Sequence, residues 1–294
     1  MGSNLLPQES PTSARSTEAL AQRIARIEEK AAPKALAVAM HDVASGISFR
    51  HNADRWFHAA STIKVAILLG VYAEIHAGNL VPQSRVHVRN RFRSAWDGKP
   101  FRVASERDAN PDVQAAIGST MRVSELALHM IATSSNLATN LLIDLIGIEP
   151  IQRSLDSLGI HGVDVRRGVE DERAFEHDIN NRVTANGLME LLLAIAEGRA
   201  VSPEMSQEMV DVLHQQEFKS GIPARLPKQV RVAHKTGEIS TIAHDAGIVY
   251  PPDHPPYVLV VLTEWAPDGS GRSATIAEVS GAIYEFLHDG GLGG

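Results

Sequence analysis

Apolar residues recur at helical spacing in some parts of the chain and at strand spacing in others. In residues 17–32 they return every three or four positions between charged residues, which predicts an amphipathic helix. Short, partly β-branched runs at 35–40 and 46–50 predict a hairpin, and the runs at 247–250 and 257–263 flank a Pro-rich turn in the same way. We therefore expect one sheet built from strands at both ends of the chain.

A long, mostly helical middle separates these strands. Helical periodicity is found in residues 62–76, 123–130, 136–146, 151–158, 185–197, 203–214 and, closing the chain, 274–287. The predicted fold class is α/β: an antiparallel sheet flanked by helices, plus an all-helical domain. The predicted divisions are a disordered N-terminal segment at 1–16, a discontinuous sheet domain at 17–60 and 223–290, and a helical domain at 61–222.

Composition narrows the function classes. The 294 residues are 44% hydrophobic and carry a formal charge of −7 without a basic cluster, so nucleic-acid binding has little support. The absence of cysteine excludes disulfides and thiolate chemistry, and the 13 histidines lack metal-ligand spacing, so no metal or cofactor is expected. No apolar run approaches the roughly 20 residues of a membrane span. The N-terminus does not read as a signal peptide.

The first motif with chemical content is Ser61-Thr62-Ile63-Lys64, at the start of an apolar helix. A spacing of three residues puts the lysine amine on the same helical face as the hydroxyl, where a desolvated lysine can accept the serine proton. The helix N-terminus would direct the Ser61 N–H toward a developing oxyanion. Alone, the pattern also fits a capping serine with a surface lysine.

Two further motifs follow. Ser134-Ser135-Asn136 opens a helix, so that Ser134 can relay a proton and Asn136 can bind a substrate amide, although a helix-capping serine explains the pattern too. Lys235-Thr236-Gly237 lies on a predicted edge strand, where Lys235 and Thr236 would bind a carboxylate and Gly237 would allow close approach of a ligand.

The three motifs together, in this order, resemble those of the class A β-lactamase-like family within the serine β-lactamase and penicillin-binding protein superfamily. The resemblance covers about 17–287. It implies a β-lactamase/transpeptidase-like fold with the site between two domains, and hydrolysis of a β-lactam or related amide or ester through an acyl-enzyme. It also implies a periplasmic or secreted location and a small-molecule substrate that carries a carboxylate.

The resemblance also assigns a base for deacylation. The family holds its deacylating water with a glutamate in a loop, and the matching loop here runs from Arg167 to Asn181, with Glu170 as the candidate base. Arg167 and Asn181 are the candidate partners that close the loop. A pairing of Glu170 or Asp171 with an arginine inside the loop is the competing interpretation.

Three residues depart from the family pattern or extend it. Ser135 stands where class A enzymes usually have aspartate. Glu238 takes the position whose N–H completes the oxyanion hole, and its charge would disfavour a substrate carboxylate. An arginine that supports this carboxylate is missing from the next strand, where His244 is either a substitute at low pH or a structural histidine.

Trp96 either walls the cleft or closes a loop core. The sequence thus predicts a serine hydrolase with Ser61, Lys64, Ser134 and Glu170 as catalytic residues. The alternatives are a D-alanyl-D-alanine peptidase or esterase of the penicillin-binding type, and a penicillin-recognising domain that acylates without turnover.

Overall fold

A five-stranded antiparallel sheet forms the centre of the molecule, in the order β10-β11-β12-β1-β2. The computed structural model describes residues 11–289. The strands are β1 (Ala35–Asp42), β2 (Ser48–His51), β10 (Arg231–Ile239), β11 (Ile242–Tyr250) and β12 (Tyr257–Glu264). Because β1 pairs along its length with β12, the two ends of the chain build one sheet, as predicted.

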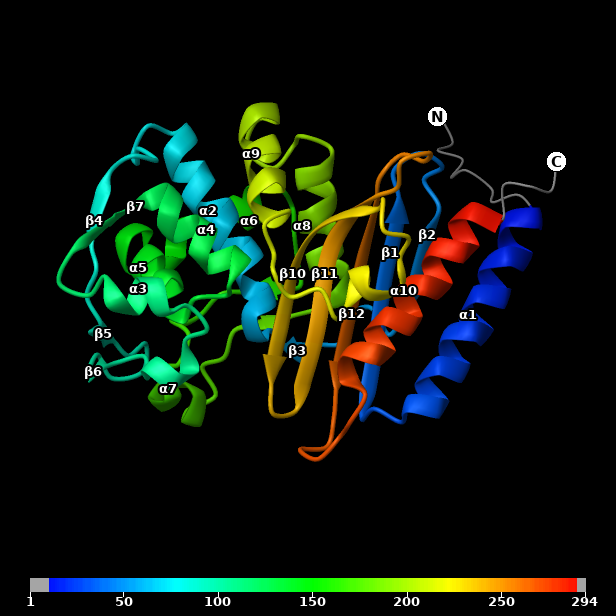
Figure 1. Cartoon of the computed structure of the whole chain (residues 1–294), viewed down its shortest axis with the longest axis horizontal. Helices are drawn as coiled ribbons and strands as arrows, with labels where there is room; N and C mark the ends of the chain where they lie inside the picture. The colour runs from blue at the N-terminus through cyan, green and yellow to red at the C-terminus, as the bar shows by residue number, and fades with distance from the viewer. Residues whose placement is uncertain (1–10, 290–294) are drawn as a thin grey trace, which may run out of the picture.

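Both faces of this sheet are covered, and alternate residues of each strand enter different cores. In β1, Ala35, Ala37 and Ala39 join the core shared with the helical part, whereas Leu36, Val38 and Met40 face the other way. Side chains of a strand point alternately to opposite faces, so a strand buried on both faces becomes an unbroken apolar run. The outer core lies under α1 (Pro11–Ala31) and α10 (Arg272–Asp289), which run side by side over one face (Figure 1).

The helical part is arranged around α2 (Lys64–His76), which is buried along its first nine residues, to Tyr72. A helix that is apolar all round is expected only inside a core. Other helices pack around it or line the sheet: α4 (Val123–Ala132), α5 (Asn136–Ile146), α6 (Ile148–Ser157), α8 (Ala185–Ala196) and α9 (Pro203–Leu213). Figure 1 shows this group of helices beside the sheet, opposite α1 and α10.

The helices of the sequence analysis are confirmed with small changes at their ends. The first helix begins at Pro11, inside the segment predicted to be disordered; residues 1–10 of that segment lie outside the described residues. Ser61 is not in the α-helix but in the 3-10 turn η1 (Ala60–Ile63), and the α-helix begins at Lys64. The nucleophile candidate therefore sits one tight turn before the helix.

Short strand pairs organise the polar stretches between the helices. They are β3 (Phe57–His58), β8 (Val163–Asp164) and β9 (Arg182–Val183) in one small sheet, β4 (Arg85–His87) with β7 (Thr120–Arg122), and β5 (Phe92–Arg93) with β6 (Pro100–Phe101). Brief helical segments complete them: η2 (Ser105–Arg107), α3 (Pro111–Ala115), α7 (Glu172–Glu176) and η3 (Ile222–Arg225). These segments fix the loops that surround the cleft.

The proposed division at residues 61 and 222 stays a prediction. Helix α8, inside the range 61–222, packs directly on β12, β1 and β11, and one apolar core includes residues from both parts. In the described chain, every helix is too short or too polar to cross a bilayer.

Candidate active site

The three motifs meet at one cavity of about 270 Å³. Its lining includes Ser61 from η1, Ser134 and Asn136 from the start of α5, and Thr236, Gly237 and Glu238 from β10. Because β10 is an edge strand, its outer side is free to face the helical part. The fold thus brings together residues that lie more than 170 positions apart in the sequence.

Ser61 is held on a tightly packed turn. Ala60 just before it has a φ of 46°, a conformation that residues other than glycine rarely adopt. Its N–H donates to Nδ1 of His58 at 3.1 Å. A Cβ on Gly237 would lie 3.1 Å from both Ser61 N and Thr62 N. The glycine of the third motif therefore permits close approach of β10 to the serine turn itself, rather than only to a ligand.

Lys64 connects the first two motifs. Its Nζ donates to the Ser134 carbonyl at 2.7 Å and to Asn136 Oδ1 at 2.8 Å, and Ser134 Oγ lies 3.1 Å away. In the part of the chain that the structure describes, no hydrogen bond joins Lys64 to Ser61. Burial, and then the nearby Lys235, hold the pKa of the Lys64 ammonium well below its usual range. A neutral amine here gives its two hydrogens to the two carbonyl oxygens and keeps a lone pair for a hydroxyl proton.

The two serines of the second motif have different roles: one caps a helix and the other lines the cavity. Ser135 caps α5, since its hydroxyl accepts from Ala138 N at 3.1 Å, whereas Ser134, with a φ of 61°, faces the cavity. Asp108 Oδ2 accepts from Leu137 N at 2.8 Å and from Ser135 Oγ at 3.2 Å. A carboxylate from another loop therefore supports the turn in which class A enzymes usually have an aspartate of their own.

Lys235 lies beneath the cavity rather than on its wall. The side chain is fully buried, and Nζ donates to the Thr236 carbonyl at 2.9 Å. Burial lowers the pKa of Lys235 to about 7, although Asp245 opposes the shift. The group changes charge near neutral pH, while Thr236 and Gly237 are the residues of the motif that line the cavity.

The charge of Glu238 is neutralised by a residue that the sequence analysis missed. Glu238 Oε1 pairs with Arg272 Nη2 at 3.0 Å, and Arg272 Nη1 donates to the carbonyls of Ile239 and Ser240. Arg272 thereby ties the first turn of α10 to the tip of the β10–β11 hairpin. The expectation that the charge of Glu238 disfavours a substrate carboxylate stays a prediction, and the ion pair with Arg272 weakens that effect.

A second cavity, of about 710 Å³, adjoins the first on the side of the 167–181 loop, and Ser61 and Asn136 line both. Glu170 lies in its wall with a φ of 62°. Glu170 Oε2 pairs with Arg107 Nε at 2.8 Å, and Asn136 Nδ2 lies 3.4 Å from Oε1. Burial raises the pKa of Glu170 above its usual value, and Arg107 opposes that rise. The arginine comes from outside the loop, contrary to the competing interpretation.

Asn181 closes the loop through the backbone. Its Oδ1 accepts from the N–H of Arg166 and of Arg167, and its Nδ2 donates to the Arg167 carbonyl at 3.0 Å. Asp171, next to Glu170, is fully buried, caps α7 through Ala174 N and accepts from Ala95 N at 2.8 Å. Arg167 and Asn181 are joined as predicted, with the backbone of Arg167 rather than its guanidinium as the partner.

Two sequence alternatives are resolved by packing. His244 is buried; its Nδ1 lies 3.0 Å from both Thr263 N and the Ala243 carbonyl, and its Nε2 lies 3.0 Å from the His58 carbonyl. Burial lowers the pKa of His244 to about 4, so it is a neutral structural histidine. Trp96 neither lines the two cavities nor closes a core: it is 51% exposed and stacks on His177 in the described structure.

Sequence reasoning missed Arg107, Asp108 and Arg272. Arg107 and Asp108 lie in the long, weakly periodic polar stretch at 85–120. Long loops of this kind are often functional, and this was the sequence signal that pointed to the region. Arg272 follows the glycine that precedes the last helix and gave no comparable indication.

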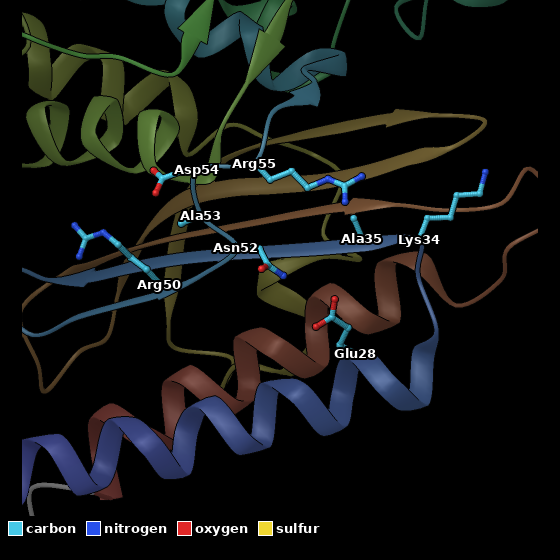
Figure 2. Close-up of a pocket in the computed structure, with 8 residues that line it drawn as sticks. All are labelled: Glu28, Lys34, Ala35, Arg50, Asn52, Ala53, Asp54 and Arg55. Carbon is cyan, nitrogen blue, oxygen red and sulfur yellow. The ribbon is translucent and has the colours of Figure 1, made fainter.

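A hollow of about 530 Å³ lies elsewhere, between α1 and the β1–β2 edge of the sheet. Figure 2 shows Glu28 rising from α1 below the strands that carry Arg50 and Ala35. Its charged groups bind neighbours: Arg55 pairs with Glu264, and Glu28 with His51. None of the three motifs contributes a residue to its lining.

Known proteins resemble this chain over almost its whole length. The model of the beta-lactamase enzyme family matches residues 19–287. A β-lactamase of Streptomyces fradiae is 26% identical, over 85% of this chain and 80% of that protein. The crystal structure of a β-lactamase from Sphaerobacter thermophilus has a TM-score of 0.78 and 26% identity, covering 94% of this chain and 98% of the other.

An ancestral class A β-lactamase has a TM-score of 0.77 and 27% identity, covering 90% of this chain and 99% of the ancestral one. The family match, the relatives and the convergence of the three motifs on one cavity agree. The chain belongs to the β-lactamase enzyme family, and its sequence and fold are class A-like.

Proposed function

We propose that this chain is a serine β-lactamase that opens its substrate through an acyl-enzyme on Ser61. The observation that carries the proposal is the buried Lys64 amine, which bonds Ser134 and Asn136 beside the cavity that Ser61 lines. Burial favours its neutral form, the form that accepts a proton. The family match supports the same reaction.

Acylation proceeds from these positions. Ser61 Oγ gives its proton to Lys64, directly or through water, and attacks the lactam carbonyl, forming a carbon–oxygen bond. Backbone N–H groups of Ser61 and Glu238 hold the oxyanion. The carbon–nitrogen bond of the lactam then breaks, and Ser134 delivers the proton from Lys64 to the leaving nitrogen. The 3.1 Å between Lys64 Nζ and Ser134 Oγ supports this transfer.

Substrate binding uses the third motif and the amide of the second. Thr236 binds the carboxylate at the cavity wall, Lys235 beneath it supplies the positive charge that attracts the carboxylate, and Asn136 orients the side-chain amide of the substrate. Both polar atoms of the Asn136 amide already have partners in the protein: Oδ1 accepts from Lys64, and Nδ2 donates to the Arg107 carbonyl at 2.8 Å. The substrate amide must bind in addition to these partners or in place of one of them.

Deacylation is assigned to Glu170. An acyl-enzyme ester hydrolyses slowly unless a positioned base takes a proton from the attacking water. Glu170 lies in the wall of the larger cavity, which Ser61 also lines, and this neighbourhood supports the assignment. Water adds to the ester carbonyl, the bond to Ser61 Oγ breaks, and the proton returns to the serine.

The location and substrate range follow only from the family. We propose that the protein acts outside the cytoplasm on a small β-lactam that carries a carboxylate.

The first test replaces the nucleophile. Ser61→Ala is expected to lower kcat for a chromogenic cephalosporin by several orders of magnitude, because no acyl-enzyme can form. Thermal unfolding should stay close to that of the unchanged protein. Ser157→Ala is the control, since this serine is exposed on α6 and its hydroxyl donates to the Ser154 carbonyl of the same helix.

Intact mass spectrometry then separates the possible activities. A transient adduct on Ser61 with continued turnover supports the β-lactamase, and a permanent adduct would make the protein a penicillin-recognising one instead. If Ser61→Ala kept more than a small fraction of the activity, Ser61 would not be the nucleophile.

A further inference from the structure

Arg107 stands between the two cavities and contacts the candidate base directly. It ends η2 and lines both cavities. Its carbonyl accepts from Asn136 Nδ2 at 2.8 Å, so the backbone of Arg107 is fixed to the residue that also bonds Lys64. The Arg107 side chain therefore extends from a backbone position that Asn136 holds next to the catalytic Lys64.

The guanidinium binds two carboxylates of the 167–181 loop. Arg107 Nε pairs with Glu170 Oε2 at 2.8 Å, and Nη1 pairs with Glu172 Oε1. The Glu170 side chain is 19% exposed, and that of Glu172 is 70% exposed. One arginine thus links a sheltered carboxylate at the site to an exposed carboxylate outside it.

This contact decides where Glu170 points. The backbone of Glu170 has a φ of 62°, a conformation that costs of order 1–3 kcal/mol in residues other than glycine and persists only when the surroundings hold it. Oε2 is bound to Arg107, and the remaining contact, between Oε1 and Asn136 Nδ2, is long at 3.4 Å. The ion pair is the shorter and stronger of the two restraints.

We propose that Arg107 is a positioning residue for the Glu170 carboxylate, and that Arg107 and Glu172 together set the pH range in which the acyl-enzyme is hydrolysed. This inference rests on the proposed function, because it concerns its second half-reaction. Arg107 favours the ionised form of the base and aligns it, and Glu172 counteracts this because its own negative charge lies close to Glu170.

Charged groups face Glu170 from four segments. Arg107 on η2, Arg167 in the loop and, when it is protonated, Lys64 on α2 favour its ionised form, whereas Glu172 on α7 disfavours it. Burial, the largest effect, raises the pKa of Glu170. Removing Arg107 and removing Glu172 must therefore move the ionisation of the base in opposite directions.

The test measures deacylation as a function of pH. Preformed acyl-enzyme, made with a slowly turned-over β-lactam, is diluted into buffers from about pH 4 to 8, and the decay of the adduct is followed by intact mass spectrometry. The rate falls on the acid side where the base becomes protonated. For Arg107→Gln we expect this acidic limb to shift up by about one pH unit, as for a carboxylate that loses an adjacent cation.

Glu172→Gln should shift the same limb down, by less than one unit, because the exposed carboxylate is screened by solvent. Arg107→Lys keeps the cation and should bring the limb back toward that of the unchanged protein. Glu176→Gln, on the same short helix but outside the ion cluster, should leave it in place.

Two results would overturn the inference while turnover persists. The first is an Arg107→Gln enzyme that is slower by the same factor at every pH with an unmoved limb, which marks a purely structural role. The second is a shift of the same sign in Arg107→Gln and Glu172→Gln. A protein that never forms an adduct on Ser61 would instead contradict the proposed function, so the two failures are distinguishable.

Discussion

Lys64 and Lys235 are both fully buried beside the cavity, and their environments differ. Lysine is almost never fully buried unless it is paired. Lys64 bonds three oxygens of the second motif, whereas Lys235 bonds one backbone carbonyl. Burial lowers the pKa of both groups, that of Lys64 well below its usual range and that of Lys235 to about 7. Lys64 serves as a base when it is neutral, and Lys235 attracts an anion in the cavity when it is charged.

Lys235 should therefore make substrate binding depend on pH. Burial lowers its pKa to about 7, so the ammonium is present below this pH and is lost as the pH rises through 7. We expect KM for a β-lactam to rise by about tenfold, or about 1.4 kcal/mol, between pH 6 and pH 8.5, because the substrate carboxylate then loses the attraction of the ammonium beneath the cavity.

Steady-state kinetics of the unchanged protein and of Lys235→Arg test this expectation. The guanidinium stays protonated throughout, so the variant should have a KM that hardly changes over the same range. A pH-independent KM in the unchanged protein would contradict the assigned role of Lys235.

The residues of the three motifs were predictable because their chemistry is encoded at short spacing. Ser61 and Lys64 lie three positions apart, and Ser134 and Asn136 two, so local sequence was sufficient. Arg107 and Asp108 act on Glu170 and Leu137, which lie 63 and 29 positions away, and only the folded chain places them there. Glu238 shows the same limit, since its charge is neutralised by Arg272 from another element.

Among the elements, the start of α5 shows how one loop supports another. The Asp108 carboxylate accepts from the N–H of Leu137 and from the hydroxyl of Ser135, the capping residue. A negative group at a helix N-terminus satisfies unpaired N–H groups and interacts favourably with the helix dipole. The support matters to the site because Ser134 and Asn136 belong to the same turn.

Removing this carboxylate should cost stability and activity together. Asp108→Ala is expected to lower the free energy of unfolding by about 1–2 kcal/mol, the usual cost of losing a cap, and to lower kcat/KM by displacing Ser134 and Asn136. Ser135→Asp in that background returns a carboxylate to the turn and should restore part of both quantities.

The same Ser135→Asp change alone should destabilise the protein, because two carboxylates would then share one turn. Chemical denaturation of the three variants measures the coupling between the two positions. Additive effects would show that Asp108 and Ser135 do not form one support.

Helices and long strands were predictable because each carries its own period. The apolar pattern of 136–146 matches α5 to the residue, and that of 185–197 exceeds α8 by one. The two-residue strands β3, β8 and β9 have no period to detect, since they exist only through pairing with each other. The 3-10 turn at Ser61 was not predicted as separate from the helix, because its apolar residues continue the periodic pattern of α2.

At the scale of the whole molecule, the site lies where the sheet meets the helical part, and one apolar core continues across this boundary. The serine turn packs against β10, with the missing side chain of Gly237 allowing the contact. Both lysines are consequently buried in the continuous interior of the protein. Burial makes the two lysine amines easier to deprotonate, but it lowers the free energy of unfolding of the protein.

This loss predicts how stability changes with pH. Lys235 has a pKa of about 7 in the folded protein, against about 10.4 for a lysine in an unfolded chain. Between these values the unfolded chain binds more protons, so the contribution of Lys235 to the free energy of unfolding increases as the pH rises from 7 to about 10. Below pH 7 the full cost of burying its charge is present.

Lys235→Met removes that cost while filling a similar volume. At pH 7 we expect the inactive variant to have a Tm higher by about 2–4 °C, which corresponds to roughly 1 kcal/mol for a large domain. The gain is limited because the Thr236 carbonyl loses its donor. Differential scanning fluorimetry from pH 7 to 10 checks the sign: the Tm difference should shrink as the pH rises, because Lys235 then becomes neutral in both states. A variant that is less stable than the unchanged protein by the same amount at every pH would show that the buried ammonium does not oppose folding.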